Sequence, residues 1–411
     1  MRFAPCLLLT ALAVGACATS PEQVFVNEAL PAAEREMDFL LRSLESLHPD
    51  PFGRVGEDEF RSLCAAAVER FDPTDPAAWH LELRQLVALV ADSHTRIEGL
   101  GPFEGSVTPF LLQPFPDGWW IIGAFRGFQE LVGCRVLAFD GQPIEAVLEQ
   151  LRPYLSYENE ASFREFAPNF LRHPSFLHAI GITSSRDSIL LEVKDLSGNQ
   201  RSVRVPARRD DYGYGTHLIE PDEEEPWRLR HPDLIYWQGF PVKDVLYIRY
   251  TACRNDPAQP IADFADEVDR ALRAMQPRTA IIDLRGNGGG DSSILAPVIR
   301  LFERGGPGSD LHLVALTDAG TFSSGLLNAW QLRERAGAEL AGEPSAQRPN
   351  CFGEIVSFIL PVSGTKISCS TKIFRIVPGN PEQMEVDVAI PLQGADWFRG
   401  RDPVLSHFLA E

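Results

Sequence analysis

Apolar strands and amphipathic helices alternate between residues 245 and 316, and this pattern constrains the fold more than any other feature of the sequence. Strands are predicted at 245–250, 280–284 and 311–316, and helices at 261–275 and 294–302. Strands joined through a helix run parallel, because the helix carries the chain back to the end of the sheet where the first strand began. The pattern therefore predicts an α/β fold with a largely parallel, helix-covered sheet.

The first of two notable strand-to-helix junctions is a glycine run at residues 285–290, Arg-Gly-Asn-Gly-Gly-Gly. Ligands and reacting groups gather at such junctions in parallel sheets. The N–H groups of the run can bind a phosphate or a carbonyl oxyanion. The alternative is a structural role, in which the glycines only permit a tight turn. Nucleotide binding is disfavoured, because no Lys-Ser/Thr pair follows and the spacing departs from G-x-G-x-x-G.

The second junction is Thr321-Phe322-Ser323-Ser324-Gly325, between the strand at 311–316 and a helix that contains Leu327 and Leu332. A serine at this place exposes its hydroxyl beside the positive end of the helix dipole. The N–H of the next residue can then donate to an oxyanion. Ser323 is therefore a candidate nucleophile, and plain N-capping of the helix is the alternative.

A candidate base, His94, lies far earlier in the chain. Asp75-Pro76 predicts the start of a helix. His94 comes four residues after Val90, the last member of its apolar stripe, so its ring is expected to face whatever this helix packs against. The alternative is a histidine held by the dipole at the helix C-terminus. The stripe consists of Trp79, Leu83, Leu86, Val87 and Val90.

Short strands replace helices from residue 102 to 206. Strands are predicted at 119–125 and 135–139, a helix at 144–151, and a hairpin around Ser197-Gly198-Asn199. This order resembles a PDZ-like module, which binds an extended peptide as an added strand. An insertion at 154–182 interrupts the resemblance, and a purely structural small domain is the alternative.

The N-terminus has the pattern of an export signal. Arg2 precedes an apolar stretch at 7–16, and Val14-Gly15-Ala16-Cys17 is a lipobox-like sequence. We expect Cys17 to be lipidated, with a secretory signal cleaved near Ala18 as the alternative. Ala18 after Cys17 favours, by resemblance to bacterial lipoproteins, the periplasmic side of the outer membrane.

The charge and the cysteine content of the chain limit which ligands and partners it can bind. The chain carries 57 acidic against 38 basic residues, a formal charge of −19, which disfavours nucleic-acid binding. Its later cysteines lack metal-ligand spacing and their number is odd, so no metal is expected and no disulfide is assigned. These cysteines are Cys64, Cys134, Cys253, Cys351 and Cys369.

Three ordered motifs resemble the C-terminal-processing (tail-specific) serine peptidase family. They are Asp283-Leu284-Arg285-Gly286-Asn287-Gly288-Gly289-Gly290, Thr321-Phe322-Ser323-Ser324 and Gly342-Glu343-Pro344-Ser345. Two flanking regions are also similar to this family: His48-Pro49 to Asp92-Ser93-His94-Thr95, and Asp402-Pro403-Val404-Leu405. The resemblance therefore extends over most of the chain after the signal.

Within this family, the sequence is most similar to the tricorn-core-like Ser-His-Glu branch. The Ser-Lys branch is disfavoured, because residues 345–350 contain Arg348 in place of a lysine, and arginine stays protonated. The resemblance implies Ser323 as nucleophile, His94 as base and Glu385 as the residue that orients His94. Glu382 or Asp387 could substitute for Glu385. The N–H groups of Gly289 and Ser324 are the expected oxyanion donors.

The sequence patterns predict the domain organisation, and the resemblance implies the fold of the core. We expect a lipoprotein signal at 1–17, an N-terminal helical domain at 18–101, a PDZ-like domain at 102–206, a connector at 207–240 and a crotonase- or ClpP-like catalytic core at 241–411.

The implied function is an exported serine endopeptidase. It would act on extended or unfolded polypeptides through an acyl-enzyme, with no metal or organic cofactor. A non-catalytic peptide- or lipophile-binding lipoprotein on the same scaffold is the alternative, and acyl transfer or hydrolysis on a small molecule is a weaker one. Formation of a homo-oligomer is left open.

Overall fold

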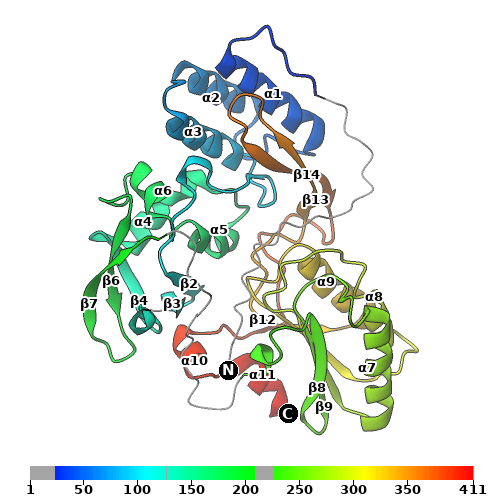
Figure 1. Ribbon diagram of the computed structural model, residues 1–411. Coiled ribbons are helices and arrows are strands. Elements are labelled where there is room, and N and C mark those ends of the chain that lie inside the picture. The colour runs from blue at the N-terminus through cyan, green and yellow to red at the C-terminus, as the bar shows by residue number, and fades with distance from the viewer. Residues whose placement is uncertain (1–23, 126, 209–225, 411) are drawn as a thin grey trace.

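The computed structural model describes residues 24–125, 127–208 and 226–410, which form three regions (Figure 1). A helical region lies at one end, a β-rich region lies beside it, and a helix-covered sheet forms the core. Cys17 and the export signal lie outside the described residues. Within these ranges no helix is both long and apolar enough to cross a membrane.

The core is a six-stranded sheet in the order β15-β12-β11-β10-β9-β8. All neighbouring pairs are parallel except β8 with β9, so the predicted α/β class and largely parallel sheet are confirmed. The strands are β8 Tyr236–Val242, β9 Val245–Tyr250, β10 Thr279–Asp283, β11 His312–Thr317, β12 Glu339–Gly342 and β15 Val388–Ala389.

Both faces of this sheet are covered (Figure 1). Leu246 and Ile248 of β9 point to one face and pack with three helices, whereas Tyr247 points to the other face and packs with α11 (Pro403–Leu409). This alternation follows from the two-residue period of a strand. The three helices are α7 Ile261–Met275, α8 Ala296–Phe302 and α9 Ser324–Ala336.

The sheet extends into the segment predicted as a connector. β8 begins at Tyr236, inside 207–240, and Tyr236 and Trp237 are buried. Their aromatic rings pack on Phe264 and Tyr247 from opposite faces of the sheet, which gives this strand its place at the edge. Residues 209–225 of the predicted connector lie outside the described residues.

Three helices form the helical region: α1 Ala32–Leu47, α2 Glu57–Glu69 and α3 Pro76–Ala88. Asp75 caps α3 by accepting a hydrogen bond from the Ala78 N–H at 2.9 Å, as the Asp-Pro pair predicts. The whole predicted stripe from Trp79 to Val90 is buried. Local sequence signals therefore specify this helix and its packing face.

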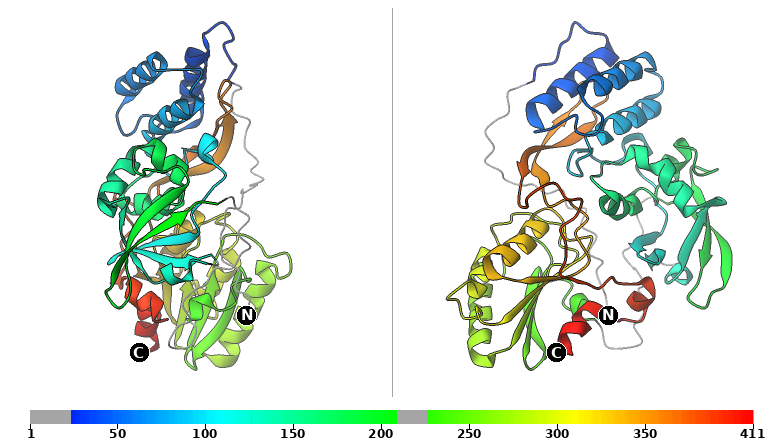
Figure 2. Two further views of the ribbon diagram at one scale, coloured as in Figure 1. Left: turned by 60° about the vertical axis from the view of Figure 1, so that its left-hand side comes forward. Right: turned by 180° about the vertical axis from the view of Figure 1, so that it is seen from behind.

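A C-terminal hairpin leaves the core and completes the helical region (Figure 2). Its strands are β13 Cys351–Ile359 and β14 Lys366–Phe374, and β14 pairs with β1 (Arg96–Ile97). Ile367 and Cys369 are fully buried among the helices. The predicted core at 241–411 is therefore not one spatial unit, because Ile367 and Cys369 of this hairpin pack in one cluster with residues of α1, α2 and α3.

The β-rich region is an antiparallel sheet in the order β2-β3-β4-β6-β7, with β5 paired to β4. The predicted hairpin is present between β6 and β7. The strands are β2 Phe110–Phe115, β3 Gly118–Ala124, β4 Arg135–Phe139, β5 Gln142–Pro143, β6 Ser188–Lys194 and β7 Gln200–Pro206. The region's helices are α4 Ile144–Leu151, α5 Glu160–Phe166 and α6 Pro174–Ala179, and α10 Gly394–Phe398 packs against it.

The insertion at 154–182 lies along the outer edge of this sheet. Arg164 of α5 donates to the Phe115 carbonyl at 3.3 Å, and the Thr108 N–H donates to the Arg172 carbonyl at 2.8 Å. These bonds engage the main chain at the last residue of the edge strand β2 and two residues before the strand begins. An added peptide strand would compete with them for the same edge.

Candidate active site

The structure brings Ser323 and His94 together although they are 229 residues apart, with His94 Nε2 3.2 Å from Ser323 Oγ. Ser323 is half-buried at the start of α9 and has φ 54° and ψ −124°. A non-glycine residue in such a conformation costs about 1–3 kcal/mol and persists only when its surroundings enforce it. The turn therefore holds the Ser323 hydroxyl toward the imidazole at an energetic cost.

The glycine run enforces this turn. The Phe322 N–H donates to the Asn287 carbonyl at 2.9 Å, and Ser324 Oγ donates to the Gly290 carbonyl at 2.6 Å. Gly289 has φ 106°, and a Cβ there would lie 2.8 Å from Ser323 Cβ. Only glycine permits this approach.

The two predicted oxyanion donors differ in their surroundings. The Gly289 N–H donates to Asn287 Oδ1 at 3.0 Å and is therefore already engaged. Ser324 is the first residue of α9, where an N–H has no acceptor within its own helix. Ser324 is thus the better placed of the two, and Gly289 would have to exchange its Asn287 contact to take part.

A buried ion network fastens the start of the glycine run to α11. The Arg285 guanidinium donates to Asp283 at 2.9 and 2.6 Å, and to both oxygens of Asp402 at 2.8 Å. Burial opposes ionisation of Asp402, but Arg285 outweighs it and lowers the pKa of this carboxyl. Asp402 also caps α11 by accepting from the Leu405 N–H at 3.1 Å.

His94 is held by its main chain and by its ring. Its N–H donates to Asp92 Oδ1 at 3.0 Å, and the ring packs on Phe322 with 5.0 Å between centroids. Asp92 is fully buried, and its other oxygen accepts from Thr95 and Ser370 at 2.6 Å each and lies 3.3 Å from His48 Nε2. Burial lowers the pKa of His94, and the Asp92 carboxylate only partly opposes this shift.

Gln347 and Glu158, which the sequence did not indicate, complete the surroundings of the imidazole. Gln347 Nε2 lies 3.4 Å from His94 Nδ1 and 3.4 Å from Glu158 Oε1. Gln347 Oε1 accepts from the Ser323 N–H at 2.7 Å. Burial, with a smaller contribution from Asp92, raises the pKa of Glu158 to about 7.

Glu158 lies in the insertion of the β-rich region, directly before α5. The Asn159–Ser162 capping box at the start of α5 is a readable local signal, but it indicates a helix start and not a partner. Arg348 N–H donates to Glu158 Oε2 at 3.2 Å, which ties the insertion to the loop before β13. Only tertiary packing places Glu158 near His94.

The structure does not bring Glu385, or either of its substitutes, to His94. Glu385 is exposed, and its carbonyl accepts from Arg333 at 3.0 Å. Glu382 pairs with Arg348 at 2.5 Å, and Asp387 pairs with Arg333 at 2.5 Å. This segment joins the sheet as β15, and Arg333 and Arg348 bind its carboxylates at Asp387 and Glu382.

Asp92, His94 and Glu158 are the one group among the described residues whose side chains could together ligate a metal, with their ligand atoms within 4.8 Å of one another. Histidine and carboxylate ligands suit Zn²⁺. However, Asp92 is already hydrogen-bonded through both oxygens, and the Gln347 amide contacts both His94 and Glu158. Gln347 thus bridges His94 and Glu158, and Asp92 binds the main-chain N–H of His94.

The five described cysteines are all buried and unpaired.

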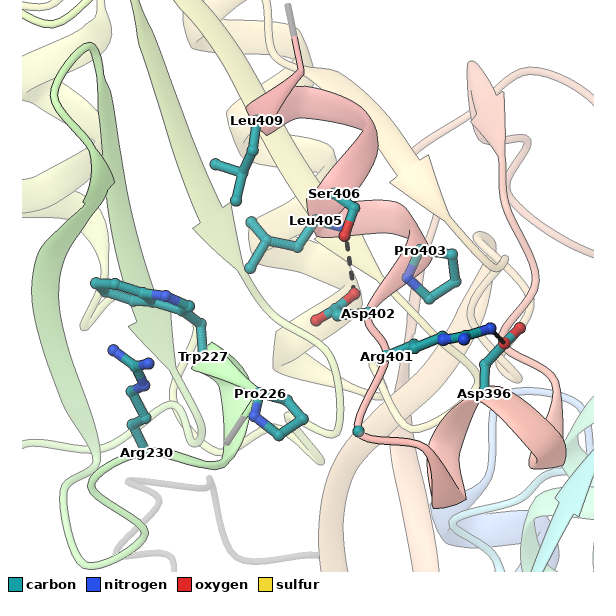
Figure 3. A pocket seen from close by; sticks show the side chains of 11 residues that line it. Pro226, Trp227, Arg230, Asp396, Arg401, Asp402, Pro403, Leu405, Ser406 and Leu409 are labelled. Atoms are coloured by element: carbon teal, nitrogen blue, oxygen red, sulfur yellow. Dashed lines mark hydrogen bonds and ion pairs between the residues drawn. The ribbon is translucent and has the colours of Figure 1, made fainter. Parts of the chain in front are cut away.

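A surface cavity of about 430 Å³ lies beside α11, and neither Ser323 nor His94 lines it (Figure 3). Trp227 lies on one side of this cavity and Leu405 and Leu409 of α11 on the other, while Arg401 turns toward Asp396 at 3.8 Å.

Comparison with known proteins identifies the fold. No family model and no curated protein matches this sequence. The structure of mature CPAF complexed with lactacystin matches with a TM-score of 0.66 and 15% identity, covering 92% of this chain and 97% of that chain. The CPAF s499a mutant matches with a TM-score of 0.64 and 13% identity, covering 92% and 96%.

The photosystem II D1 C-terminal processing protease matches with a TM-score of 0.48 and 13% identity, covering 88% of this chain and 94% of that chain. The chain shares its fold with CPAF over nearly the full length of both proteins. The expected α/β fold with additional regions around a core is therefore confirmed.

Proposed function

We propose that this protein is a serine endopeptidase that cleaves extended or unfolded polypeptides. The observation that carries the proposal is the 3.2 Å contact between Ser323 Oγ and His94 Nε2 at the start of a helix. A hydroxyl within hydrogen-bond reach of an imidazole is the arrangement that activates a serine nucleophile. The resemblance of three sequence motifs to tail-specific serine peptidases supports the same conclusion.

In the proposed reaction, Ser323 Oγ attacks the scissile carbonyl carbon while His94 Nε2 accepts the hydroxyl proton. His94 then gives this proton to the leaving amine, and an acyl-enzyme remains. Water, deprotonated by His94, hydrolyses the acyl-enzyme and restores Ser323. The Ser324 N–H would stabilise the oxyanion in both steps.

The carboxylates that stabilise the charged imidazole are Asp92 and Glu158 in this proposal, in place of Glu385. Asp92 Oδ1 lies 3.8 Å from His94 Nδ1, and Glu158 lies on the far side of the Gln347 amide. Small movements would bring either carboxylate to hydrogen-bond distance. Ser323, His94 and these two carboxylates then perform the roles that the Ser-His-Glu branch assigns to its three residues.

Export and anchoring form a separate part of the proposal, supported by Arg2, the apolar stretch at 7–16 and the sequence around Cys17. We propose a lipid anchor on Cys17 and a periplasmic location at the outer membrane. Incorporation of a labelled fatty acid into the wild-type protein, and its absence from Cys17→Ser, would test the anchor.

A serine-reactive phosphonate probe together with casein turnover tests the peptidase. Wild type should be labelled and should cleave casein, Ser323→Ala should do neither, and His94→Gln should lose most activity. Ser293→Ala is the matched control, because Ser293 is exposed just before α8. Equal labelling of wild type and Ser323→Ala would contradict the assignment of the nucleophile.

The alternative is a peptide- or lipophile-binding lipoprotein on the same scaffold. It is favoured by one observation, the engagement of the Gly289 N–H by Asn287, which leaves the oxyanion site incomplete. A folded protein that binds peptides without labelling or turnover under any condition would support this alternative.

A further inference from the structure

Both ends of the Gln347 side-chain amide are fixed by their neighbours. The Ser323 N–H can only donate, and it lies 2.7 Å from one end of the amide, so that end must be the oxygen. The amide nitrogen therefore faces Glu158 Oε1 and His94 Nδ1, both at 3.4 Å. Turning the amide over would place its N–H groups against the Ser323 N–H.

This orientation determines where the proton of His94 resides. The amide nitrogen of glutamine carries two donors and accepts nothing, so His94 Nδ1 is the acceptor in its contact with Gln347, while the Phe352 main chain is a further partner that acts to raise the pKa of the ring. In a neutral imidazole whose Nδ1 accepts, the proton is on Nε2. Nε2 is the atom 3.2 Å from Ser323 Oγ, so the imidazole donates to the serine instead of accepting from it.

We propose that Gln347 is a positioning residue that holds the resting protein in an inactive tautomer, with His94 Nε2 protonated. The inference rests on the proposed function, because the base can take the Ser323 proton only through an unprotonated Nε2. In Ser-His-Asp enzymes, the wrong tautomer lowers kcat about 10⁴-fold. Gln347 would thus keep the nucleophile and base adjacent but unreactive.

Activation requires the Gln347 amide to move away from Nδ1. The proton can then reside on Nδ1 and be accepted by a carboxylate, either Asp92 Oδ1, now at 3.8 Å, or Glu158. Gln347 lies in the loop between β12 and β13, where Ala346 N–H donates to the Ala319 carbonyl at 3.2 Å beside the Ser323 turn. Because Gln347 contacts Ser323 N directly, substrate that displaces the Ser323 turn also disturbs the amide.

The test exchanges the hydrogen-bond donor that faces His94 Nδ1 for an acceptor, without changing the shape of the side chain at position 347. Gln347→Glu retains an oxygen for the Ser323 N–H and presents an acceptor to Nδ1–H. The new carboxylate at position 347 would face the Glu158 carboxylate, so Gln347→Glu is combined with Glu158→Gln, whose amide N–H can donate to that carboxylate. Gln347→Ala, which adds no charge, is the second variant. Gln200→Glu at the exposed start of β7 is the control for the charge change.

Two measurements are made on the full chain. The first is the ¹⁵N NMR signal of His94 in histidine-labelled protein, assigned by its loss in His94→Gln. We expect the proton on Nε2 in wild type and in Gln200→Glu, and on Nδ1 in the double variant. The second is casein cleavage, for which we expect the double variant to have at least a 10-fold higher kcat and Gln200→Glu to match wild type.

Each outcome separates this inference from the peptidase assignment. A wild-type protein with the proton on Nδ1, or a tautomer unchanged in both the double variant and Gln347→Ala, would overturn the role of Gln347 even if casein is cleaved. A tautomer that moves as expected, with no cleavage by any variant, would support the role of Gln347 and count against the peptidase. The expected shift together with faster cleavage supports both.

Discussion

Replacing Arg285 by methionine tests the buried network that fastens the glycine run to α11. Arg285, Asp283 and Asp402 are 4%, 0% and 9% exposed, and every hydrogen bond from the Arg285 guanidinium to the two carboxylates is 2.9 Å or shorter. Methionine fills much of the same volume but pairs with neither carboxylate. The variant therefore leaves two buried acidic groups without their shared cation.

The expected loss of stability is large. Removing one partner of a buried ion pair costs about 3–5 kcal/mol, because the remaining charge stays buried. The loss should depend on pH with a defined sign. The folded-state pKa of Asp402 is lowered, so its contribution is present above the unfolded value of about 3.9 and is lost as the pH falls below it. Wild type and variant should therefore converge in stability in acid.

Urea unfolding followed by tryptophan fluorescence measures this loss, since Trp237 packs in the same cluster as α11. With an m-value of about 2–3 kcal/mol/M, the midpoint should fall by about 1–2.5 M. Arg278→Met is the matched control: Arg278 is 78% exposed and its one ion pair, to Asp244 at 3.2 Å, should contribute at most about 1 kcal/mol.

A double variant decides whether uncompensated charge is the cause. Arg285→Met with Asp402→Asn removes the carboxylate whose ion pair Arg285→Met abolishes and keeps an N-cap for α11, so it should be more stable than Arg285→Met alone. A midpoint for Arg285→Met equal to that of Arg278→Met, or a double variant less stable than the single one, would refute the reasoning.

Three further predictions concern the site and its supports. Because burial lowers the pKa of His94, kcat/KM for casein should rise with pH through a midpoint below about 6.5, and a midpoint above 7 would contradict His94 as the base in this environment. Gly289→Ala should reduce kcat at least about 100-fold, because the added Cβ would lie 2.8 Å from Ser323 Cβ and 2.9 Å from the Ser324 N. Gly288→Ala is the control and should be tolerated, because its added Cβ would have no atom within 4 Å. Equal kcat values for the two variants would refute this prediction. Ile367→Ala in β14 should lower the free energy of unfolding in urea by about 2–5 kcal/mol, and Ile355→Ala on the exposed side of β13 should lower it much less. Equal losses would contradict the packing of the hairpin into the helical core.

The sequence by itself determined the strands and helices of the segment from 245 to 316 and the positions of the two strand-to-helix junctions. The predicted strand at 245–250 and helix at 261–275 have the bounds of β9 and α7, and Asp75 caps α3 as its Asp-Pro pair indicates. These features depend on hydrophobic periodicity and on bonds between residues a few positions apart. Such signals are contained within one short segment of sequence.

Only the tertiary structure decided which side chains surround His94. Gln347 reaches the imidazole from the loop before β13, and Glu158 reaches Gln347 from the β-rich region, while Glu385, expected from a motif, lies exposed beside Arg333. The same holds for the hairpin of β13 and β14, whose Ile367 and Cys369 are buried in the cluster formed by α1, α2 and α3. These contacts join residues that are far apart in the chain, and no local periodicity or capping pattern encodes which distant surface will bury a given face.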